Sequence, residues 1–175
     1  MRLRRLSALT TGMTFLLLLL GVYTKEVGAD LTCGMRWPLC DGAVFGLFPA
    51  NLASAIEWLH RFLALLVGLL VIWLAIRAYR ELGGGSRIFR ASLLALLLLP
   101  VQAGLGALTV VKYRVFTPET AAELSPLIST AHYGTGIALF TGLVAATLWA
   151  RDRGPSVRQA ATDPRSGTTG SDALE

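Results

Sequence analysis

Four apolar stretches, each long enough to cross a lipid bilayer, constrain this chain more than any other feature of its sequence. They cover about residues 7–24, 53–79, 88–111 and 125–150, and a bilayer core requires roughly 20 mainly apolar residues per helix. Apolar residues make up 54% of the chain, a share typical of small polytopic membrane proteins. Because backbone groups in lipid must be bonded internally, we predict an all-α membrane protein with a four-transmembrane-helix bundle over residues 1–150.

The remaining residues form one long loop, two short loops and a polar tail. The long loop, residues 25–52, is rich in Gly and Pro, and the tail, residues 151–175, is rich in Gly, Ser, Thr and Asp. Such a polar tail lacks the apolar residues needed for a packed core, so we predict that it is disordered.

The basic residues are distributed unevenly between the two ends of the predicted bundle. Eleven lie at the end that holds both termini, and four lie at the end that holds the long loop. The positive-inside rule therefore places both termini in the cytoplasm and the 25–52 loop on the outer face of the cell membrane. The net charge of +5 does not indicate a nucleic-acid partner, because no basic cluster is interleaved with aromatic residues.

The first apolar stretch permits a second interpretation. Its basic start, its apolar core and the small residues Val27, Gly28 and Ala29 resemble a cleavable signal peptide. Removal of this segment would leave three helices instead of four.

The chain contains two histidines, His60 and His132, each within an apolar stretch. Each lies seven residues after the expected outer start of its helix, Ala53 or Ser125, which corresponds to a depth of roughly 10 Å at 1.5 Å per residue. Two imidazoles at equal depth are suited to ligate a heme iron from both sides. The alternative is that each histidine only forms a hydrogen bond across the bundle, but ionisable groups inside a membrane usually serve function.

Three further polar residues lie near the histidines in the predicted bundle. Glu57 shares a helix face with His60 and is a candidate proton donor or acceptor, or a group that fixes the imidazole by a hydrogen bond. Arg61 could neutralise a heme propionate, pair with Glu57, or extend to the membrane interface. Gln102 is either a pocket residue or one side of a hydrogen bond between helices.

Cys33 and Cys40 lie in the loop predicted to face outside, where disulfides form. A structural bridge would stabilise the fold by only about 2–3 kcal/mol in the chain-entropy model, because the closed loop is short. A redox-active pair and a transient metal or substrate-binding site are the alternatives. A zinc site is disfavoured because two further nearby ligands are missing.

Several motifs occur together in one order along the chain. They are C-G-M-R-W-P-L-C-D-G at residues 33–42, E-W-L-H-R at 57–61, V-Q-A-G-L-G-A-L-T-V at 101–110 and A-H-Y-G at 131–134. This set resembles one of the two four-helix halves of proteins in the heme A synthase family. The resemblance covers about Thr11 to Trp149. Members of that family oxidise the C8 methyl group of heme O to a formyl group, giving heme A for terminal oxidases.

The resemblance implies a role for each candidate residue. His60 and His132 would be the axial ligands of a heme iron, Glu57 the catalytic carboxylate and Arg61 the motif arginine. Cys33 and Cys40 would form a disulfide. Heme b would be the cofactor and heme O the substrate, with heme O synthase as a donor. The electron acceptor is not identified by any motif.

The chain departs from the typical family pattern in its number of histidines. Typical members have eight helices in two halves and two pairs of heme-ligating histidines, whereas this chain has one pair. A homodimer would restore eight helices and two sites. The alternative functions are a non-catalytic membrane cytochrome b or heme-handling subunit that transfers electrons, and an assembly factor whose histidines bind nothing.

Overall fold

The computed structural model describes residues 2–34, 36–37, 40, 49 and 51–160. It is an all-α protein whose helices are α1 (Leu3–Glu26), α2 (Leu52–Leu82), α3 (Arg87–Val115) and α4 (Pro118–Ala160). All four are long and apolar enough to cross a membrane. The prediction of an all-α chain with four long apolar helices is thereby confirmed.

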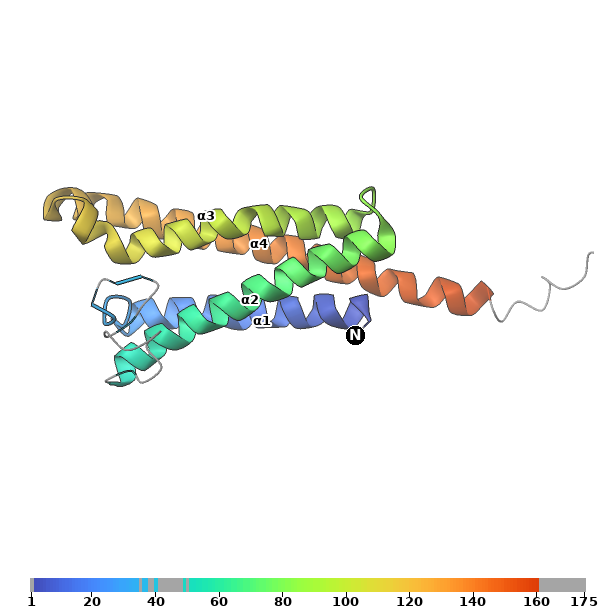
Figure 1. Cartoon of the computed structure of the whole chain (residues 1–175), viewed down its shortest axis with the longest axis horizontal. Coiled ribbons are helices and arrows are strands. Elements are labelled where there is room, and N and C mark those ends of the chain that lie inside the picture. The colour runs from blue at the N-terminus through green and yellow to red at the C-terminus, as the bar shows by residue number, and fades with distance from the viewer. Residues whose placement is uncertain (1, 35, 38–39, 41–48, 50, 161–175) are drawn as a thin grey trace, which may run out of the picture.

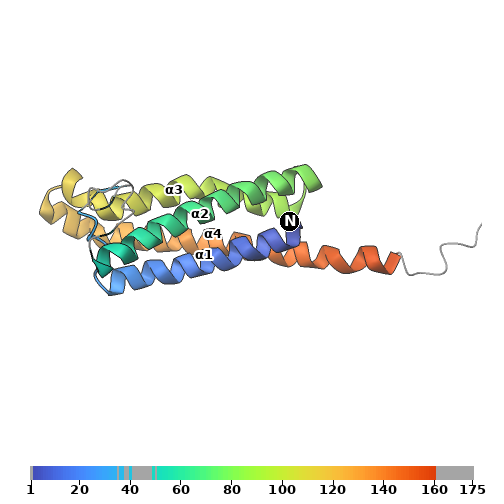
Figure 2. The same cartoon turned by 60° about the horizontal axis from the view of Figure 1, so that its bottom comes forward.

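The helices run up and down in sequence, so each is antiparallel to its neighbours in the chain (Figure 1). α1 packs against α2 and α4, and α3 packs against the same two helices, so α2 and α4 lie diagonally across the bundle. The N-terminus and the end of α4 lie at one end, and residues 27–34 lie at the other (Figures 1 and 2). We call these the terminal end and the loop end.

Side-chain caps define where two of the helices begin. The Asn51 side chain accepts a hydrogen bond from the Ser54 amide at 2.9 Å, and Ser86 accepts one from the Phe89 amide at 3.1 Å. Such caps satisfy amide groups that have no partner within the helix. Gly83 follows α2 with a φ of 74°, a left-handed conformation that glycine adopts without strain.

The fourth helix differs most from the range predicted for it. It begins at Pro118 rather than near Ser125, and it continues through Ala160, so residues 151–160 of the predicted disordered tail are helical. Hydropathy detects only the apolar part of a helix. An established helix can continue into polar sequence, because each added residue forms one further hydrogen bond. Residues 161–175, the rest of that tail, lie outside the described residues.

The apolar core of the bundle lies toward the terminal end. Its main cluster consists of Leu6, Val67, Val71, Leu74, Ala95, Leu139 and Leu143. Buried hydroxyl groups beside it donate to carbonyls of their own helix, as Thr10 does to Leu6 at 2.9 Å and Ser92 to Ile88 at 2.8 Å. Outward-facing leucines such as Leu65 and Leu97 stay exposed, as expected for surfaces that face lipid.

Candidate heme-binding site

The polar residues predicted to act in chemistry lie toward the loop end of the bundle, beyond the apolar core. His60 lies on α2, about two turns after the helix begins. Its imidazole contacts Gly21 of α1 so closely that a Cβ atom built on Gly21 would lie 2.9 Å from His60 Cε1. The absence of a side chain at Gly21 therefore makes room for the imidazole.

The second histidine has the same kind of neighbour. His132 lies on α4, and a Cβ atom built on Gly106 of α3 would lie 3.1 Å from His132 Cε1. The α1–α2 hairpin and the α3–α4 hairpin thus each provide one histidine, and each histidine is packed against a glycine of the helix that precedes it.

Contacts one turn away show that the two histidines occupy the same layer of the bundle. A Cβ atom built on Gly136 would lie 3.0 Å from Gln102 Nε2 and 3.1 Å from Leu18 Cδ2, so α1, α3 and α4 meet at this level. Gly136 lies one turn from His132, Gln102 one turn from Gly106, and Leu18 one turn from Gly21. In each case the residue of the histidine–glycine pairs (His132, Gly106 or Gly21) is the one nearer the loop end. Both histidine–glycine pairs therefore lie one turn beyond this contact, at the same level of the bundle.

This equal depth does not follow from counting residues along the two helices. His60 is eight residues beyond the start of α2, but His132 is fourteen beyond the start of α4. The longer N-terminal part of α4 makes the counts unequal, while the packing of the four helices aligns the side chains.

Each histidine ring has one buried nitrogen without a hydrogen-bond partner within the residues that the structure describes. His60 Nδ1 and His132 Nδ1 are buried, and neither has a partner that meets hydrogen-bond geometry among the described residues. Burial of an unpartnered polar atom is costly. Two imidazoles in one layer, on diagonal helices and beside glycines, therefore fit a heme bound through both of its faces. In the described part of the chain no three His, Cys, Asp or Glu side chains cluster as a metal site would require.

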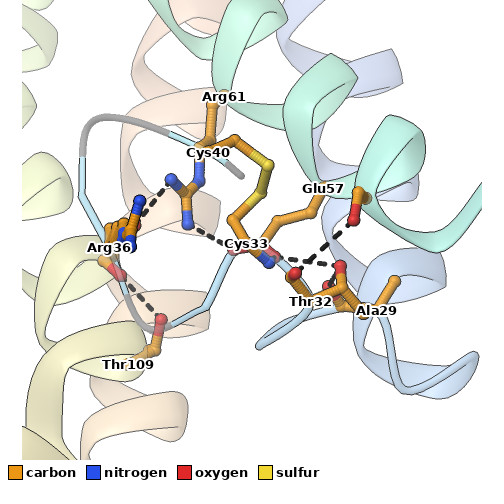
Figure 3. Close-up of polar contacts among 10 residues, drawn as sticks. Ala29, Thr32, Cys33, Arg36, Cys40, Glu57, Arg61 and Thr109 are labelled. Carbon is orange, nitrogen blue, oxygen red and sulfur yellow. Dashed lines mark hydrogen bonds and ion pairs between the residues drawn. A yellow bond between two sulfur atoms is a disulfide. The ribbon is translucent and has the colours of Figure 1, made fainter. Parts of the chain in front are cut away.

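Glu57 lies one turn before His60 and is buried, with 3% of its surface exposed. Its Oε2 accepts hydrogen bonds from the Cys33 amide at 2.8 Å and from Thr32 Oγ1 at 3.2 Å, and its Oε1 is paired with Arg61 Nη2 (Figure 3). Both carboxylate oxygens therefore have partners other than the imidazole. The structure does not contain the alternative arrangement, in which Glu57 fixes the His60 ring by a hydrogen bond.

Arg61 connects the helix to the loop. Besides its ion pair with Glu57, its Nη1 donates to the carbonyl oxygen of Arg36 at 2.8 Å. Of the predicted alternatives, the structure contains the pairing with Glu57.

Cys33 and Cys40 lie close to each other at the loop end of the bundle, near Glu57 and Arg61. Their Cα atoms are 4.3 Å apart, their sulfur atoms lie at disulfide-bonding distance, and both residues are fully buried (Figure 3). Because the Cys33 amide donates to Glu57, the position of this pair affects the carboxylate directly.

Gln102 forms a hydrogen bond between helices, since its Oε1 accepts from Thr135 Oγ1 of α4. It lies one turn below the histidine layer, so the pocket and the interhelical interpretations are compatible.

Four residues near the site were not anticipated from the sequence as parts of it: Gly21, Thr32, Thr135 and Lys112. Lys112, expected only as a charge at the loop end, is 2% exposed and donates from Nζ to the Thr109 carbonyl at 3.0 Å. Thr32 is adjacent to a motif cysteine, a signal that could have identified it. Gly106, which belongs to the 101–110 motif, contacts the His132 ring.

Several known proteins resemble this chain over most of its length. Heme A synthase of Bacillus licheniformis is 33% identical over 147 residues, which cover 83% of this chain and 44% of that protein. Heme A synthase of Bacillus pumilus is 32% identical over 81% of this chain and 43% of its own length. Protoheme IX farnesyltransferase of Halobacterium salinarum is 36% identical over 78% of this chain and 28% of its own length.

The chain thus spans less than half the length of these curated relatives. Residues 50–171, which include both histidines and Glu57, match the model of the COX15-CtaA family, described as cytochrome oxidase assembly protein. The match covers more than half of the sequence, and the chain belongs to the COX15-CtaA family.

Proposed function

We propose that this chain is a heme A synthase that oxidises the C8 methyl group of heme O to a formyl group. The observation that carries the proposal is the buried, fully paired Glu57 one turn from His60, in a bundle whose two histidines share one layer. Membership of the COX15-CtaA family and the two heme A synthase relatives support the same activity.

His60 and His132 would hold the heme through its iron, one from each hairpin. A heme held by these residues would supply the redox chemistry of the reaction. Each of two successive hydroxylations would replace one hydrogen of the methyl group by a hydroxyl group and would require a two-electron oxidant from outside the chain, and the resulting aldehyde hydrate would lose water to give the formyl group. Glu57 can accept a proton at Oε1 or Oε2, and its pairing with Arg61 holds the carboxylate in one orientation.

The segment around Cys33 would shield this chemistry from water. We propose that Cys33 and Cys40 form a structural disulfide that keeps the Cys33 amide and Thr32 against Glu57. A protein that only transfers electrons has no need for a carboxylate held in this manner, so the electron-carrier alternative is not favoured.

The proposal extends to how the chain is arranged in the cell. Its basic residues support a multi-pass protein of the cell membrane, with both termini cytoplasmic and the Cys33–Cys40 segment outside. We also propose a homodimer, in which the histidine pair of each copy would give two sites, one for heme b and one for heme O.

Heme O would be delivered by the enzyme that makes it. Part of a protoheme IX farnesyltransferase, 28% of its length, is similar to this chain. We take this similarity as support for a heme O synthase as the donor of heme O.

The test is co-expression with a heme O synthase in a host that makes no heme A. The purified protein is assayed by its pyridine hemochrome spectrum and by chromatography of extracted hemes. Appearance of heme A that depends on this chain is expected. Heme b alone, unchanged when heme O is supplied, would refute the synthase and support an electron carrier, and absence of heme would refute both.

The dimer requires a separate measurement. Two differently tagged copies are co-expressed, and one tag is used for purification in mild detergent. Co-purification of the second copy with bound heme is expected, whereas a heme-loaded single chain that forms heme A would refute the two-copy arrangement.

A further inference from the structure

We infer that Gly21 and Gly106 are positioning residues that fix the orientation of the two histidine rings, and thereby the way each ring meets a heme. This inference rests on the proposed heme-binding function. It concerns residues that lie on the helices preceding those of the histidines and that do not touch the iron themselves.

The contacts are directional. At both sites the atom nearest to the glycine is Cε1 of the imidazole, at 2.9 Å from a Cβ built on Gly21 and at 3.1 Å from one built on Gly106. The ring nitrogens lie farther away, at 3.4 and 3.8 Å for His60 and at 3.7 Å for both nitrogens of His132. The Cε1 edge of each ring therefore faces the neighbouring helix backbone.

An added methyl group would displace these rings. Separations of 2.9 and 3.1 Å are shorter than ordinary carbon–carbon contacts, which lie at about 3.5–4.0 Å. The imidazole is the part that can move, since it turns about its side-chain bonds while the helix backbone cannot shift independently. Alanine at either position would rotate the ring and with it the ligating nitrogen, and the shift should be larger for His60 because its contact is shorter.

The other glycines of the same helices show that this packing is specific. Among the described residues, no atom of a neighbouring helix lies within 4 Å of a Cβ built on Gly12 of α1 or on Gly104 of α3. They provide matched controls, because Gly→Ala at any of the four positions raises helix propensity by about 1 kcal/mol, while only Gly21 and Gly106 contact a histidine.

The heme-loaded test compares four variants with the wild-type protein: Gly21→Ala, Gly106→Ala, Gly12→Ala and Gly104→Ala. Heme retention, the absorption spectrum and the low-spin electron paramagnetic resonance signal are measured in detergent. Weaker heme retention by about 10–100-fold, the range seen when groups that orient metal ligands are lost, is expected for the first two variants only. A changed low-spin signal should accompany it, which a loss of stability alone would not produce.

A heme-free test separates this inference from the proposed function. Because the chain has only two histidines, isotope-labelled protein gives two sets of ring resonances that His60→Ala and His132→Ala assign. Gly21→Ala should shift only the His60 ring, and Gly106→Ala only the His132 ring. Ring resonances that match those of the Gly12→Ala and Gly104→Ala controls would overturn the inference whether or not the wild type binds heme. Absence of heme from the wild type, with ring shifts as expected, would instead refute the heme-binding function.

Discussion

The two hairpins of the bundle provide the same histidine–glycine pair but surround it differently. Next to His60, the α1–α2 hairpin has the buried Glu57–Arg61 ion pair, which is bonded to the loop segment. Next to His132, the α3–α4 hairpin has a neutral hydrogen bond between Gln102 and Thr135. Each hairpin therefore provides one histidine, and the charged part of one hairpin makes the two sides of the site chemically different.

The largest expected effect comes from removing the shared part. His60→Ala and His132→Ala should each abolish the six-coordinate low-spin heme spectrum, because each removes one of the two proposed ligands of the heme iron. Absorption and electron paramagnetic resonance spectra of the purified variants measure this loss. Leu65→Ala and Leu127→Ala, at exposed positions of the same two helices, serve as controls. An unchanged spectrum for either histidine variant would refute axial ligation by that residue.

Glu57→Gln should separate chemistry from heme binding. The amide keeps the shape of the side chain but loses its charge and its capacity as a base, so heme A formation should fall by about 10²–10⁴-fold with heme still bound. Extracted hemes are quantified by chromatography. Glu81→Gln is a matched control, because Glu81 also pairs with an arginine one turn away on α2 but lies exposed at the opposite end of the helix. Equal heme A formation in both variants would remove Glu57 from the mechanism.

Cys33→Ser with Cys40→Ser tests whether the loop holds the charged side in place. Loss of the bridge should lower the free energy of unfolding by about 2–3 kcal/mol. It should also reduce heme A formation less than Glu57→Gln does, since the Arg61 ion pair remains. Thermal unfolding and extracted-heme analysis are measured side by side, with reductant-treated wild type for comparison. A double variant as stable and active as the wild type would contradict the structural bridge.

The smallest effect on heme A formation is expected from replacing the threonines Thr32 and Thr135. A hydrogen bond to a charged group contributes about 1.5–3 kcal/mol and a neutral one about 0.5–1.5 kcal/mol. Thr32→Val, which removes a donor to Glu57, should therefore lower heme A formation by about 10-fold or more. Thr135→Val should lower it less, because it affects the neutral pair with Gln102. The reverse order of heme A yields would show that the charged hairpin is not the reactive one.

Much of the fold could be predicted from the sequence because lipid imposes strict rules on backbone hydrogen bonding and helix length. The four apolar stretches are the central parts of the four helices. Their ends were harder to predict, since Pro118 and the 151–160 segment lie in polar sequence where hydropathy gives no signal.

The candidate site was predictable where residues are close in the chain. Glu57, His60 and Arg61 fall within a few residues of one another, and helix geometry places them on adjacent turns. The pairing of Glu57 with the Cys33 amide joins segments separated by 24 residues, and no periodic pattern in the sequence encodes it.

The sequence by itself determined that this chain forms apolar helices of membrane-spanning length and that two of them have a histidine each. Both properties follow from residue types and short-range spacing. The tertiary structure alone decided that Gly21 and Gly106 make room for the two rings, and that Glu57 faces the loop rather than the imidazole. These features arise from packing between helices, and such packing depends on the shapes of side chains that lie far apart in the chain.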